Sequence, residues 1–94
     1  MAIYSAAVTA PVAFPAVDAP SFTIPFQPKS IVIINEDATP ANYVEFSLEG
    51  GTNAAVHGKL IPTIVAGLKI TQPVTKIWVR LGAGTPTVRI VAEQ

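Results

Sequence analysis

Prolines and glycines divide this chain into short apolar runs, and that spacing limits what it can fold into. Nine prolines and six glycines are spread over 94 residues, and no run between them repeats apolar residues with the period of a helix. Proline fixes φ and removes a backbone donor, so it interrupts helices and central strands. Short β-branched runs separated by such residues predict an all-β fold.

The runs are most regular after residue 28, where six strands are expected. They are SIVIIN (30–35), YVEFSLE (43–49), AAVHGKLI (54–61), IVAGLKI (64–70), VTKIWVRL (74–81) and TVRIVA (87–92). The first run is aliphatic throughout, which is typical of a central strand. The second run alternates, which places Phe46 in the core and Ser47 outside. We expect a small β-sandwich or jelly-roll-like domain.

The leading segment has a different composition. Residues 1–28 hold five of the nine prolines, no glycine and a single charge, Asp18. We therefore divide the chain into an extended Pro/Ala-rich N-terminal arm (1–28), which could supply one or two further strands, and a β-sandwich domain (29–94).

The arm is too apolar to lie in solvent. Ordering its backbone costs about 1–2 kcal/mol per residue, which only burial against another surface can offset. From about Ser21 onward we expect the arm to pack on its own domain, and we expect the first twenty residues to reach a partner. The predicted buried anchors are Tyr4, Phe14, Phe22 and Phe26.

Charge and cysteine content exclude several classes of protein. The formal net charge is zero and there is no cysteine, so a nucleic-acid binder held by phosphate contacts and a disulfide scaffold are not expected. The prolines also interrupt any run long enough to span a membrane.

The two signs of charge are separated along the chain. Residues 1–58 hold one lysine and five acids, a net charge of −4, whereas residues 59–92 hold five Lys or Arg and no acid, a net charge of +5. Either acidic and basic strands pair within one sheet, or the two signs meet between neighbouring copies.

No catalytic or metal-binding pattern is present in the sequence. Glu45 and Glu49 lie four apart on a strand, about 13 Å, whereas glycosidase carboxylates need about 5–9.5 Å. His57 has no cysteine or nucleophile-elbow serine to activate, and too few ligands surround it for a metal site. We expect a non-enzymatic protein without cofactor or metal.

Trp78 lies with Lys76 and Arg80 on one face of its expected strand, and Ile77 and Val79 lie on the opposite face. Three interpretations are open. The N-terminal arm of the same chain covers the indole, another chain does so, or the ring stacks on a sugar. We predict that Lys76, Trp78 and Arg80 form a second contact face.

The strand patterns SIVIIN, YVEFSLEGG, HGKLIP, KIWVRLGAG and TVRIVA resemble those of small β-sandwich virion proteins of tailed bacteriophages, particularly capsid decoration (cement) proteins. The resemblance covers residues 30–92. The apolar N-terminal arm departs from it, because many compact decoration proteins lack such a segment.

The resemblance implies a protein made in the cytoplasm of an infected cell and assembled on the outer capsid surface of the virion. Its partners would be the major capsid protein and copies of itself, as dimers or trimers, and neither nucleic acid nor membrane. The alternative is a carbohydrate- or receptor-binding module on a virion surface or tail, which would use Tyr43, His57 and Trp78.

Overall fold

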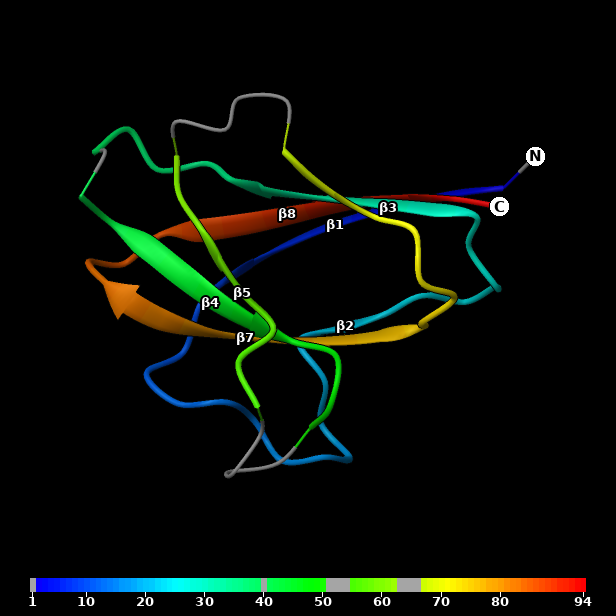
Figure 1. Ribbon diagram of the computed structural model, residues 1–94, viewed down its shortest axis with the longest axis horizontal. Helices are drawn as coiled ribbons and strands as arrows, with labels where there is room; N and C mark the ends of the chain where they lie inside the picture. The colour runs from blue at the N-terminus through cyan, green and yellow to red at the C-terminus, as the bar shows by residue number, and fades with distance from the viewer. Residues whose placement is uncertain (1, 40, 51–54, 63–66) are drawn as a thin grey trace.

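The computed structural model describes residues 2–39, 41–50, 55–62 and 67–94. It confirms the all-β prediction, with two four-stranded antiparallel sheets around one core (Figure 1). The strands are β1 (Ile3–Thr9), β2 (Phe22–Thr23), β3 (Ser30–Asn35), β4 (Tyr43–Ser47), β5 (Gly58–Leu60), β6 (Leu68–Ile70), β7 (Lys76–Ala83) and β8 (Thr87–Glu93). Within the described residues no helix is present, and hence none long and apolar enough to cross a membrane.

The strand order follows one pairing pattern. The two sheets have the orders β1-β8-β3-β6 and β2-β7-β4-β5. Strands equally far from the two chain ends pair with each other: β1 with β8, β2 with β7, β3 with β6, and β4 with β5. The first half of the chain thus runs antiparallel to the second half, as one long hairpin that turns back between β4 and β5. The β3–β8 and β4–β7 pairings fold this hairpin into two layers. The two chain ends consequently lie side by side (Figure 1).

Alternation along the strands builds the core. Every second residue of β3 and β8 is buried and the residues between them are half-buried or exposed, as expected for strands with one inner face. The inner residues meet those of the second sheet in one cluster of apolar side chains that includes Ile33, Ile90, Val44 and Ile77. A buried polar side chain, Asn35, donates to the carbonyls of Asn42 and Leu60, so its burial leaves no unpaired amide.

The N-terminal segment belongs to the same two sheets. β1 pairs with β8 along its whole length, and β2 pairs with β7. Between them, residues 10–21 run beside β7: the carbonyl of Pro11 accepts the amide of Leu81 at 2.7 Å, and the hydroxyl of Ser21 accepts the amide of Val79 at 3.0 Å.

The prediction of an extended arm (1–28) separate from a 29–94 sandwich is therefore wrong, because residues 3–9 and 22–23 are strands of the two sheets. The physical reason is that β7 and β8 each have a side that no later strand pairs, and the leading segment satisfies the backbone groups there. Contact of the first twenty residues with a partner stays a prediction.

The six strands expected after residue 28 are confirmed, with shorter limits in three of the runs, a shift of two residues for β7 and one added residue for β8. The run 30–35 coincides with β3, whereas β5 and β6 are three residues each. Parts of the runs predicted at 54–61 and 64–70 lie outside the described residues. Ser47, expected outside, is fully buried, because it lies opposite Trp78 on a face that the N-terminal segment covers.

Candidate functional site

Trp78 is covered by its own chain. The indole N–H donates to the carbonyl of Ala16 at 3.0 Å, and the residue is only 4% exposed. Gly50 lies against the same ring, where an added Cβ would overlap the indole. Of the three interpretations of Trp78, cover by the N-terminal segment of the same chain is the one confirmed.

Arg80 is held by two neighbours on the same outer face. Its Nε donates to Glu45 at 2.9 Å, from the adjacent strand β4, and its guanidinium lies 4.6 Å from the centre of the Phe14 ring. A half-buried Arg with both an acid and an aromatic face is geometrically fixed. It therefore serves the attachment of residues 10–21 to the sandwich.

Two acid–base pairs join the acidic and basic segments within the fold. Glu45 pairs with Arg80 across β4 and β7, and Glu36 pairs with Arg89 at 3.0 Å. In each pair the acid comes from the first part of the chain and the base from the last. This confirms that acidic and basic segments pair within a sheet.

The seven predicted interface residues are mostly used internally. Phe14, Phe22 and Trp78 are buried, Tyr4, Phe26 and Arg80 are half-buried, and Lys76 alone is exposed. Phe22 belongs to the core, and Tyr4 and Phe26 pack against it. The structure therefore does not bring these seven together as one exposed surface.

The proposed sugar-binding patch is not assembled either. Trp78 offers no open face for stacking, and the ring of Tyr43 is covered by the Lys59 ammonium, 3.9 Å from its centre. His57 is exposed, but lies at a pocket on another part of the sandwich. A recognition site built on Trp78 and Tyr43 is therefore not supported.

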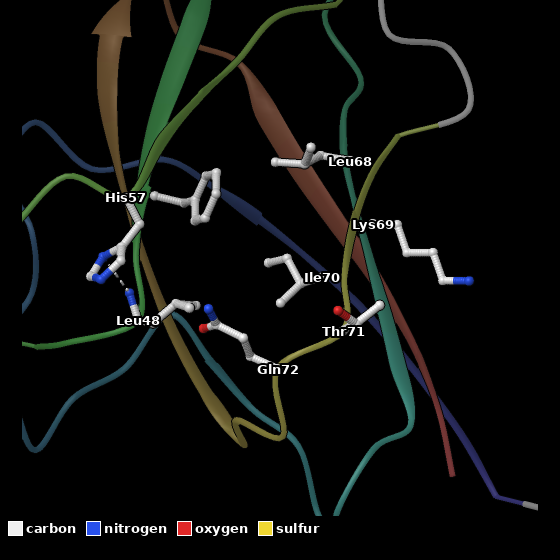
Figure 2. Close-up of a pocket in the computed structure, with 8 residues that line it drawn as sticks. Leu48, His57, Leu68, Lys69, Ile70, Thr71 and Gln72 are labelled. Atoms are coloured by element: carbon white, nitrogen blue, oxygen red, sulfur yellow. Dashed lines mark hydrogen bonds between the residues drawn. The ribbon is translucent and has the colours of Figure 1, made fainter.

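A pocket that sequence reasoning missed lies between the β4–β5 side of one sheet and β6 of the other. Its volume is about 270 Å³. The lining residues are Phe46, Leu48, His57, Leu68, Lys69, Ile70, Thr71 and Gln72. Leu68 and Ile70 point into it, Lys69 points away, and the Gln72 side chain extends toward Leu48 (Figure 2).

His57 is positioned at this pocket by backbone contacts. Its Nδ1 accepts the amide of Leu48 at 3.2 Å (Figure 2). The carbonyl of Ala55 lies 3.1 Å from the same nitrogen. Nδ1 accepts from Leu48 in one tautomer of the ring and donates to Ala55 in the other. The His57 ring thus helps to fix the backbone directly after β4, which is a structural role.

The pocket's size and lining indicate what it can hold. Its volume lies just below the range of about 300–1,000 Å³ of pockets for drug-sized molecules, and its lining combines apolar side chains with polar ones. In the part of the chain that the structure describes, no three or more His, Cys, Asp or Glu residues lie close enough to hold a metal ion.

In comparisons with protein families, with curated proteins and with solved structures, no match to this chain was found.

Proposed function

We propose that this chain is a jelly-roll protein that attaches to the outside of a tailed-phage capsid and stabilises contacts between major-capsid subunits, without enzymatic activity. The observation that carries the proposal is the strand order. Orders β1-β8-β3-β6 and β2-β7-β4-β5 are those of an eight-stranded double sheet rolled from one long hairpin, the architecture of jelly rolls. Viral capsid domains and lectins both use that architecture.

The surface best suited to the capsid contact is the pocket beside β6. It is lined by Leu48, Leu68 and Ile70 and is bordered by polar groups of Thr71 and Gln72. An apolar centre with a polar rim is the usual anatomy of a protein interface. Apolar side chains of a capsid subunit would occupy it. Many such contacts on one particle would together give firm attachment.

A particle-binding experiment tests the proposal. Purified chain is mixed with phage particles assembled without it, and the particles are separated by sedimentation. We expect saturable binding and a higher temperature of particle disruption. If the chain stays in the unbound fraction at every concentration tried, the proposal is wrong.

A pair of matched variants tests the pocket. Thr71→Arg places a large cation at the pocket rim, and Thr23→Arg places the same group at another exposed position, on β2. Thr71→Arg should weaken particle binding at least about tenfold, which corresponds to about 1.4 kcal/mol, and Thr23→Arg should leave it unchanged. Equal binding by both variants would exclude the pocket as the attachment point.

A further inference from the structure

The free side of β1 carries a row of backbone groups that the sandwich does not use. The amide of Gln94 donates to Ala2 and the amide of Ala10 donates to Pro86, which continue the register of the β1–β8 pair at both ends. Along an antiparallel strand, residues that bond to the partner strand alternate with residues whose amide and carbonyl point away from that partner. Even-numbered residues of β1 therefore bond to β8, and the amides and carbonyls of Ile3, Ser5, Ala7 and Thr9 face the open edge.

A second set of contacts gives the same parity. The carbonyls of Glu93 and Thr87 accept amides of Lys29 and Glu36 on the β3 side of β8. The odd-numbered residues of β8 thus face β3, which leaves its even-numbered residues to face β1. Among the described residues, β1 pairs with no strand other than β8.

The other three edge strands are protected against pairing and β1 is not. β2 is two residues long and is flanked by Pro20 and Pro25, and β5 and β6 are three residues long with a central exposed lysine, Lys59 and Lys69. Short length, proline and lysine are the usual devices that prevent edge-to-edge association. β1 has seven residues, IYSAAVT, with no charge, proline or glycine.

We propose that the edge of β1 is a docking surface for a second copy of this chain, whose β1 pairs with it antiparallel across a two-fold axis. The register that pairs the whole strand sets Ile3 opposite Thr9 and Ser5 opposite Ala7 of the other copy, and brings the two Ala6 residues together at the axis. The odd-numbered residues then form the hydrogen-bonded pairs, as their exposed amides and carbonyls require.

The side chains of β1 fit this register. On the inner face Tyr4 lies opposite Val8 of the other copy, an aromatic and β-branched pair of the kind that stabilises sheets. At the axis, alanine allows close approach. No charge on either strand opposes a like charge, so a strand of this composition can face itself without electrostatic cost.

Ile3, which is 64% exposed, lies on β1 itself, at one end of the paired strands. The second copy would cover its side chain, which adds apolar contact to the hydrogen bonds. Pairing requires no capsid, and the inference is independent of the proposed function.

Sedimentation equilibrium of the purified chain tests this docking surface. Ala7→Pro removes an amide that points away from β8, which an edge strand tolerates, and Ala7→Lys adds a charge at the same exposed position. We expect the unmodified chain to dimerise and both variants to raise the dimer dissociation constant at least about tenfold. Thr71→Arg, on the opposite side, should dimerise normally.

Single cysteines test the register, because the chain has none of its own. Under mild oxidation Ala6→Cys should form a covalent dimer, whereas Ser5→Cys and Ala7→Cys should not, since each opposes the other residue. Circular dichroism of each variant confirms that it is folded. A chain that stays monomeric at all concentrations, or dimers that survive both Ala7 substitutions, would overturn the inference. Particle binding by such a monomer would leave the proposed function intact.

Discussion

Trp78 shows how a side chain on the outer face of a sheet becomes part of the interior. The alternation of its strand correctly places it opposite Ile77 and Val79, on the outer side, but residues 10–21 cross that side and cover it. The Ala16 carbonyl supplies the acceptor that a buried indole N–H needs. The ring therefore fixes the loop to the sandwich.

Substitution of Trp78 should lower the free energy of unfolding in proportion to the packing and hydrogen bonding that it removes. Trp78→Phe keeps most of the packing but loses the hydrogen bond, and should lower the free energy of unfolding by about 1–2 kcal/mol. Trp78→Ala should cost about 3–5 kcal/mol. Urea unfolding measures both. Lys76→Ala, at an exposed position of the same strand, should change stability by less than about 0.5 kcal/mol; similar effects at the two positions would show that Trp78 is not buried.

The Glu45–Arg80 pair should couple more strongly than the Glu36–Arg89 pair. The side chains of the first are 26% and 34% exposed, those of the second 36% and 43%, and solvent weakens exposed pairs. Double-mutant cycles with alanine should give a coupling of up to about 1 kcal/mol for Glu45–Arg80 and less for Glu36–Arg89. Both couplings should fall as salt is added. A stronger coupling at the more exposed pair would contradict this order.

At the scale of the elements, sequence reasoning succeeded where the composition of a run and its flanking residues decide its conformation. SIVIIN matches β3 residue for residue, because an uninterrupted aliphatic run bounded by a proline and a polar turn has little freedom. Sequence reasoning also allowed one or two strands in residues 1–28, which β1 and β2 confirm, but it missed the partner of residues 3–9. A segment as apolar as IYSAAVT could pair with its own chain or with another one. Nothing in the neighbouring sequence indicates that residues 87–93 of the same chain are its partner.

The pocket and the free edge were missed for a related reason. Leu68, Ile70 and Leu48 are ordinary core-type residues in the sequence, and only the folded sandwich brings them together around a pocket. Similarly, an edge strand is defined by what does not pair with it. Its one signal in the sequence was the absence of charge and proline from residues 3–9.

Removal of β1 should destabilise the whole sandwich. A chain without residues 2–9 loses seven paired residues and exposes the edge of β8 and the core beneath Tyr4 and Val8. Its midpoint of thermal unfolding should fall sharply, or the chain should fail to fold, as circular dichroism would reveal. Ile3→Ser, at a position that is 64% exposed, is the matched control and should have little effect. Unchanged stability after the deletion would mean that β1 is not part of the fold.

At the scale of the whole molecule, the pairing of strands equally distant from the chain ends makes this a fold of distant contacts. Residues 3–9 must find residues 87–93 before the first sheet is complete. The cost of closing such a loop precedes the gain from pairing. The same strand pairing explains why the apolar N-terminal segment forms a sheet edge, because the first strand of a rolled hairpin lies at the border of its sheet.

Hydrogen exchange of the β1 amides, followed by NMR in dilute solution, tests the central claim that the N-terminal segment is an edge strand of its own sandwich. The amides of Tyr4, Ala6 and Val8 should exchange slowly, because they donate to β8, whereas those of Ser5, Ala7 and Thr9 should exchange quickly and slow down as concentration rises. Rapid exchange at all six positions would describe a loose arm, and would contradict the account.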